Sequence, residues 1–142
     1  MKTGKKGLDL IKSFEGFKPK AYVCPAGVLT IGYGHTKYAS KTMVVDEAKA
    51  TVLLQEDLRV AENAVNAEKL TLTQNQFDAL VSFVFNCGSG NFKKSTLLKM
   101  IKINPNSANI SFEFNRWNRG GGRVLAGLTR RRIAEAKLYF EP

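Results

Sequence analysis

The sequence predicts a mostly helical α+β fold, with a small lobe built on one β hairpin and a larger helical lobe. Through most of the chain, apolar residues recur at three- and four-residue spacing, which is typical of amphipathic helices. One pair of short β-like runs is separated by a turn signal. We expect a single domain over residues 1–142, with the first helix and the β lobe in about residues 1–45 and the helical lobe in about residues 46–142.

Length and composition fit an ordinary globular domain. A chain of 142 residues with 44% hydrophobic and 24% charged residues is large enough to need neither a disulfide nor a metal for stability. Lysine and arginine number 22 against 12 aspartates and glutamates, a formal charge of +10. Such a field favours anionic partners, and charge alone leaves both nucleic acid and the bacterial wall open.

The chain opens with a predicted helix over about residues 5–14. Its apolar positions are spaced for one face: Leu8, Ile11 and Phe14. Glu15 follows in the last turn, where the helix dipole disfavours a carboxylate. The position is therefore unusual. Glu15 is either simply solvated, or its carboxyl group is placed there to serve catalysis.

A hairpin is predicted directly after this helix. Gly16 suits a left-handed helix end, and two β-like runs follow at residues 20–23 and 29–33. Residues 24–27, Cys-Pro-Ala-Gly, form the turn between them. The hairpin folds back beside the helix end, so we expect Glu15, Cys24 and Thr30 to line one wall of a cleft.

Two long helices should follow the polar connector after the hairpin. Asp46 is a candidate N-cap for a helix that runs to about Val65. Thr73 and Gln76 have the spacing of a capping box for the most apolar helix of the chain. The predicted buried positions of the two helices are Leu54, Leu58, Ala61, Val65, Phe77, Leu80, Val81, Val84 and Phe85.

Three shorter helices complete the prediction. Residues 88–90 close the apolar helix, Ser95 caps the next one, and another starts near Ser107. Residues 120–122, three glycines, are expected to be a mobile loop. The last helix should span residues 129–140. The inward positions of this last helix are expected to be Ile133, Ala136 and Phe140. Its start is expected to be solvated at Arg130, Arg131 and Arg132. The helix that starts near Ser107 has three apolar positions on one face: Ile110, Phe114 and Trp117.

The candidate chemistry lies in one short segment. Glu15, Cys24 and Thr30 are spaced as Glu, eight residues, Asp or Cys, five residues, Thr, and Thr30 opens the run Thr-Ile-Gly-Tyr-Gly-His-Thr. This segment resembles the catalytic segment of the phage-type lysozymes, glycoside hydrolase family 24. Weaker similarity covers residues 85–88, 95–98, 116–117 and 127–132. The resemblance implies a lysozyme-like, two-lobed fold.

Glycoside hydrolysis needs an acid for the leaving oxygen and stabilisation of positive charge while water attacks. In this interpretation Glu15 is the acid and Thr30 holds the water. Cys24 activates water, stabilises charge as a thiolate, captures the sugar, or is only a small residue of the cleft wall. The resemblance implies saccharide contacts at Thr36, Phe85 and Ser95, although the spacing of Phe85 also fits the core.

The remaining residues of the segment have mainly structural interpretations. His35 is expected to be a hydrogen-bonded structural histidine. Gly32 and Gly34 mark points where the backbone approaches sugar or the neighbouring helix closely. Tyr22 and Tyr33 either stack on sugar rings or pack the small lobe.

The implied function is that of an endolysin. It hydrolyses the β-1,4 bond between N-acetylmuramic acid and N-acetylglucosamine in peptidoglycan, with inversion, and thereby lyses the host cell. One alternative is a lytic transglycosylase on the same bond, which needs only one Glu. The other, from a different class, is a non-catalytic basic module that binds wall or DNA.

No cofactor and no metal are expected, because Cys24 and Cys87 follow no metal-binding pattern, and a bridge between them is not expected. Peptidoglycan is the expected partner. We expect no nucleic-acid partner and no stable membrane insertion, and we expect the chain to be a monomer. The N-terminus lacks the apolar core of a signal peptide. Synthesis in the host cytoplasm is therefore expected, and the resemblance implies that a holin-type partner provides passage to the wall.

Overall fold

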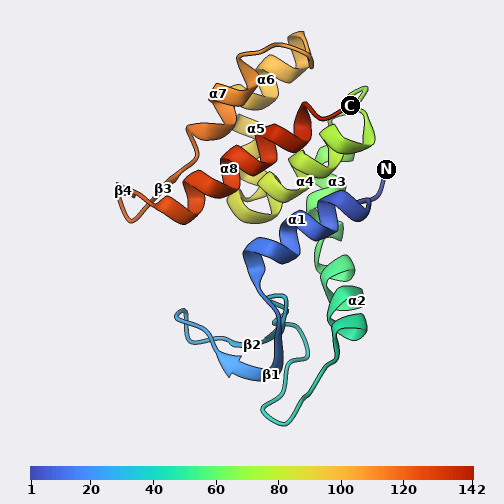
Figure 1. Ribbon diagram of the computed structural model, residues 1–142, viewed down its shortest axis with the longest axis vertical. Helices are drawn as coiled ribbons and strands as arrows, with labels where there is room; N and C mark the ends of the chain where they lie inside the picture. The colour runs from blue at the N-terminus through green and yellow to red at the C-terminus, as the bar shows by residue number, and fades with distance from the viewer. The chain divides into compact units, whose positions relative to one another are not determined.

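The computed structural model describes residues 1–142 and divides into two compact units (Figure 1). One unit is Ile11–Arg59, and the other combines Met1–Leu10 with Val60–Pro142. The chain forms eight helices and two small two-stranded antiparallel sheets. This confirms the predicted α+β, mostly α, fold class.

The smaller unit contains the predicted hairpin. Helix α1 (Lys5–Glu15) ends at Gly16, whose φ of 74° is left-handed as predicted. Strands β1 (Lys18–Val23) and β2 (Leu29–Gly32) then pair antiparallel, with Tyr22 opposite Thr30.

Helix α2 (Glu47–Asp57) packs against β2 and completes this unit. Asp46 caps it as predicted, since its carboxylate accepts a hydrogen bond of 2.8 Å from the backbone N–H of Lys49. The predicted continuous helix to Val65 is wrong in one respect: it is divided at Leu58, and α3 (Arg59–Asn66) follows. The predicted buried stripe is confirmed, because Leu54, Leu58, Ala61 and Val65 are all buried.

The larger unit is organised around α4 (Gln74–Cys87), on which α8 (Ala126–Tyr139) packs. The predicted capping box is confirmed: Gln76 N–H donates to the Thr73 hydroxyl at 3.1 Å, and Thr73 N–H donates to the Gln76 side chain at 3.0 Å. The centre of α4 is buried, including Phe83, whose ring packs edge-on against the rings of Phe92, Phe114 and Trp117.

Three short helices follow α4 along the chain, before α8. They are α5 (Ser89–Lys94), α6 (Thr96–Ile103) and α7 (Ile110–Asn115). Gly88 closes α4 as predicted, but residues 89 and 90 already belong to α5, a helix that was not predicted. α6 begins after Ser95 as predicted, and α7 ends before Trp117, which is half-buried.

The glycines at residues 120–122, predicted as a mobile loop, lie in a short β hairpin that was not predicted. Strands β3 (Arg119–Gly120) and β4 (Arg123–Val124) pair antiparallel around a two-residue turn. Gly121 and Gly122 supply the turn with φ values of 60° and 80°. Two successive positive φ angles are what a tight hairpin turn requires, so this Gly-Gly pair was a hairpin signal.

The predicted inward face of α8 is wrong at two positions, because Ile133 is 53% exposed and Phe140 is 39% exposed. Ala136 is buried as predicted. Arg131 and Arg132, predicted to lie at a solvated helix start, are instead buried.

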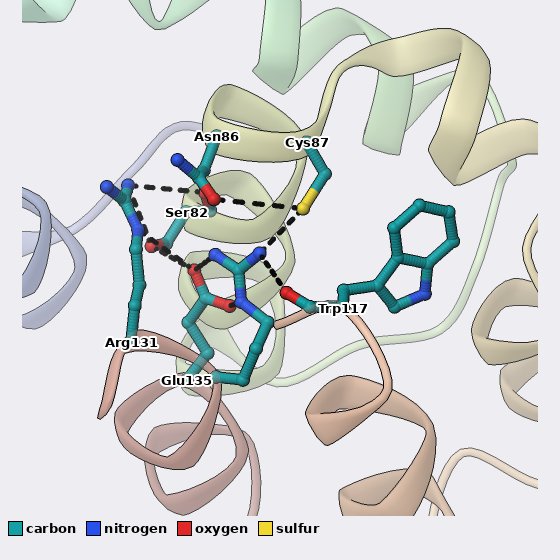
Figure 2. A network of polar contacts seen from close by, with 7 residues as sticks. Ser82, Asn86, Cys87, Trp117, Arg131 and Glu135 are labelled. Carbon is teal, nitrogen blue, oxygen red and sulfur yellow. Dashed lines mark hydrogen bonds and ion pairs between the residues drawn. The ribbon is translucent and has the colours of Figure 1, made fainter. Parts of the chain in front are cut away.

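Glu135 is the buried ion-pair partner of both arginines (Figure 2). Its carboxylate lies 2.7 Å from Nε of Arg132, 3.3 Å from Nε of Arg131 and 2.6 Å from the hydroxyl of Ser82. Arg132 also donates to the sulfur of Cys87 and lies over the ring of Phe83. Burial raises the pKa of Glu135, and Arg132, Ser82 and Arg131 oppose that rise.

Candidate active site

Glu15, the candidate acid, is the last residue of α1 and is half-buried. Its carboxylate lies next to Gly34, where a Cβ atom would come within 3.5 Å of Oε1 of Glu15. Gly34 also has a φ of 83°, which disfavours any residue with a side chain. The turn after β2 therefore holds bare backbone against the carboxylate.

That turn is held tightly on both sides. The backbone groups of Ile31 and His35 exchange two hydrogen bonds of 2.9 Å. Gly32 packs on α2, since an added Cβ would lie 3.2 Å from Cβ of Ala50. The predicted close approach of Gly32 to a neighbouring helix is confirmed.

Cys24 and Thr30 lie together across the hairpin. Cys24 is half-buried at the end of β1, and its N–H donates to the carbonyl of Val28 at 3.0 Å. The hydroxyl of buried Thr30 lies 2.9 Å from the same carbonyl. Thr30 is also among the groups that act on the Cys24 thiol.

These contacts change the acidity of the thiol. A backbone hydrogen bond at Val28, the hydroxyl of Thr30 and a backbone hydrogen bond at Ala26 hold the pKa of the Cys24 thiol below its usual range. In contrast, burial raises the pKa of the Cys87 thiol. Both cysteines are free. Cys24 is therefore the thiol that ionises at lower pH.

Alkylation should reveal this difference. Because only the thiolate reacts, we expect the rate of Cys24 alkylation to rise with pH around a midpoint below that of an ordinary thiol. Thr30→Val should move the midpoint upward, and Thr30→Ser should leave it in place. Iodoacetamide labelling followed by peptide mapping measures each cysteine separately. An unchanged midpoint in Thr30→Val would contradict the thiol–hydroxyl contact.

A second set of side chains fixes the segment around the candidate acid. His35 is 2% exposed, and its Nδ1 lies 2.9 Å from Oδ2 of Asp57 at the end of α2. The interpretation of His35 as a hydrogen-bonded structural residue is confirmed. Asp57 was not predicted, because it lies 22 residues away and nothing in the local sequence marks the pair.

Lys12, Tyr33 and Glu47 form the other support. The Lys12 ammonium lies 2.9 Å from Glu47 Oε1, and the Tyr33 hydroxyl lies 3.1 Å from the same oxygen. Lys12 also lies 5.5 Å from the centre of the Tyr33 ring. Hydrogen bonds from Lys12, Tyr33 and Thr51 hold the pKa of Glu47 below its usual range. Tyr33 is buried, which favours the packing interpretation over sugar stacking.

The other candidate residues are divided between the two units. Thr36 is exposed in the unit that contains Glu15, Cys24 and Thr30. Phe85 and Ser95 belong to the larger unit, where Phe85 is half-buried. Ser95 is buried: its hydroxyl accepts from Leu98 N–H at 3.0 Å and donates to the carbonyl of Phe92 at 2.7 Å, so it caps α6.

The structure contains neither a metal-binding cluster nor a membrane-spanning helix. No three His, Cys, Asp or Glu side chains are grouped as they would be to hold a metal ion. None of the helices has both the length and the apolar character needed to cross a membrane.

Comparison with known proteins identifies the family of the chain. The family model for phage lysozyme matches residues 12–135. The endolysin of Acyrthosiphon pisum secondary endosymbiont phage 1 is 42% identical, over 98% of this chain and 98% of that one. The endolysin of Bacillus phage PZA is 43% identical over 98% of this chain, which spans only 55% of the length of that relative.

Solved structures agree with the sequence relatives. The muramidase domain of SpmX from Asticaccaulis excentricus superposes with a TM-score of 0.89 at 39% identity, covering 99% of both chains. The chain belongs to the phage lysozyme family. This confirms the predicted family.

Proposed function

We propose that this chain is a muramidase that hydrolyses the β-1,4 bond between N-acetylmuramic acid and N-acetylglucosamine in peptidoglycan and so lyses the bacterial host. One observation carries the proposal: Glu15 ends α1 beside the backbone of Gly34, in the same unit as the Cys24–Thr30 pair. Family membership supports the same activity.

The proposed roles follow from the chemistry of the three side chains. Glu15 protonates the leaving glycosidic oxygen. The Thr30 hydroxyl donates to the Val28 carbonyl, so its remaining lone pairs can accept a hydrogen bond from the attacking water. Cys24, with its lowered pKa, supplies the partial negative charge that a carboxylate supplies in other members. Direct attack of water implies inversion at the anomeric carbon.

Saccharide contacts at Thr36, Phe85 and Ser95 remain part of the proposal. Thr36 offers an exposed hydroxyl, and Phe85 offers part of an aromatic ring. Because the Ser95 hydroxyl is occupied, it would act through the conformation of the segment that it caps. The net charge of +10 would attract the carboxylates of the peptide stems.

Passage to the wall completes the proposed function. We expect synthesis in the host cytoplasm, action on the wall as a monomer, and a holin-type partner that opens the membrane. Co-expression with and without such a partner tests this part, because lysis without it would show that the chain needs no separate route.

Clearing of a suspension of purified peptidoglycan by the purified chain tests the enzymatic function. We expect a falling turbidity together with new reducing ends. Binding without clearing would instead support the basic-module alternative.

The role of Cys24 is tested by a pair of substitutions. Cys24→Asp should retain substantial wall-clearing activity, because an ionised carboxylate can take the place of the thiolate. Cys24→Ala should lose most of it, by about 10-fold or more; the loss starts below the roughly 10²–10⁴-fold of a full general acid or base because the thiol is only partly ionised. Full activity in a folded Cys24→Ala chain would show that Cys24 has no catalytic role and only lines the site.

A further inference from the structure

The β hairpin and the loop after it carry positive charge with no acidic residue. Residues 16–45 contain no aspartate or glutamate, and they contain four lysines: Lys18, Lys20, Lys37 and Lys41. All four are exposed. None makes an ion pair in the structure, unlike Lys12, which pairs with Glu47. Their charge is therefore available to a partner.

The four lysines lie in the smaller unit, two on β1 and two on the loop that follows β2. Lys20 on β1 lies opposite Val44 in an antiparallel bridge, and Val45 N–H donates to the carbonyl of Pro19 at 2.9 Å. The segment 36–44, which leads from β2 to α2 in Figure 1, is therefore joined to β1 at its C-terminal end. We call β1 together with residues 36–44 the lysine surface.

Tyr38 is the aromatic residue of the lysine surface. Its side chain is 89% exposed, and its φ is 61°, a conformation that bulky residues rarely adopt. An aromatic ring in that conformation, packed against nothing in the chain, is a candidate for contact with a ligand. It follows Lys37 directly, and both side chains are exposed.

We infer that the lysine surface is an accessory binding surface for the peptidoglycan strand, with its lysines bound to carboxylates of the peptide stems and Tyr38 stacked on a sugar ring. The inference rests on the proposed function. Glu15, Cys24 and Thr30 lie in the same compact unit, and peptidoglycan repeats sugars and carboxylates along its length. A strand that reaches these residues continues beyond them and offers both kinds of group.

Binding without turnover is the direct test. Two four-site lysine-to-glutamine variants are compared in a Glu15→Gln background by co-sedimentation with peptidoglycan stripped of secondary polymers. One carries the substitutions at the lysine surface. The other is a charge-matched control in the larger unit, with substitutions at Lys2, Lys93, Lys94 and Lys99. We expect about a tenfold loss of affinity in the first and about twofold or less in the control. Equal losses would overturn the inference.

The identity of the anionic group is tested with two further probes. Peptidoglycan whose carboxylates have been amidated should bind both variants equally, because the groups that the lysines recognise are gone. On short duplex DNA both variants should also lose affinity equally. A selective loss that persists on amidated wall, or that is as large on DNA, would overturn carboxylate recognition.

Tyr38 gives an independent measurement. Tyr38→Gly relieves the positive φ, so the melting temperature should stay the same or rise, while affinity for peptidoglycan should fall about fivefold. Tyr38→Phe should keep the affinity. A purely structural Tyr38 would change the melting temperature and leave binding unchanged, which would overturn its role.

These outcomes are separate from the test of hydrolysis. Selective loss of binding in a chain whose parent never clears the wall would overturn the proposed muramidase function and leave the lysine surface standing. Wall clearing by the parent, with equal binding losses in the two variants, would overturn the lysine surface alone.

Discussion

The Glu15→Gln variant is expected to fold like the parent and to lose wall-clearing activity by about 10²–10⁴-fold or more. The amide has nearly the same shape as the carboxyl group but cannot give a proton to the leaving oxygen. Contact with Gly34 should survive, because it involves the position of the side chain and not its charge. Turbidity loss of purified peptidoglycan gives the rate.

Two controls make that result specific. Circular dichroism and the melting temperature should match those of the parent. Glu56→Gln, at an exposed position of α2 in the same unit, changes the net charge equally and should retain parental activity. Near-parental clearing by a folded Glu15→Gln chain would remove Glu15 as the acid.

The largest loss of stability is expected from Glu135→Gln. Arg132 is fully buried, and the Glu135 carboxylate is its ion-pair partner at 2.7 Å. Removing that charge leaves a buried guanidinium without a carboxylate, which typically costs about 3–5 kcal/mol. For a domain whose whole stability is about 5–15 kcal/mol, this is a major fraction. Urea denaturation measures the change in the free energy of unfolding.

Glu141→Gln is the matched control for this measurement. Glu141 pairs with Lys6 at 2.9 Å, but both side chains are about half exposed. Exposed pairs contribute about 0–1 kcal/mol, so the control should unfold at nearly the parental urea concentration. A cost for Glu135→Gln as small as that of Glu141→Gln would contradict the view that the cluster in Figure 2 stabilises the larger unit.

Local patterns explain which parts of the fold were predictable. The capping box at Thr73, the N-cap at Asp46 and the left-handed Gly16 are each specified by a few neighbouring residues. The face of α8 was not, because the buried Arg131 and Arg132 have partners distant in sequence, such as Ser82 and Cys87 on α4, as well as Glu135. A charged run reads as a solvated surface unless its distant partner is known.

The candidate site also has a part that local sequence predicts and a part that it does not. Glu15, Cys24 and Thr30 lie on one helix and one hairpin that are close in sequence, and the structure bonds both Cys24 and Thr30 to the carbonyl of Val28. The residues that support the segment were not predicted: Asp57 is 22 residues from His35, and Glu47 is 35 residues from Lys12. Such pairs depend on how α2 packs on the hairpin, which no local pattern reports.

The masses of the fragments released from purified peptidoglycan test the central claim most directly. Hydrolysis adds one water across the broken bond, so the proposal predicts muropeptides that end in reducing N-acetylmuramic acid. Transglycosylation by the muramic 6-hydroxyl adds no water. Fragments ending in anhydro-muramic acid, lighter by one water, would contradict the assignment of this chain as a muramidase that directs water at the glycosidic bond.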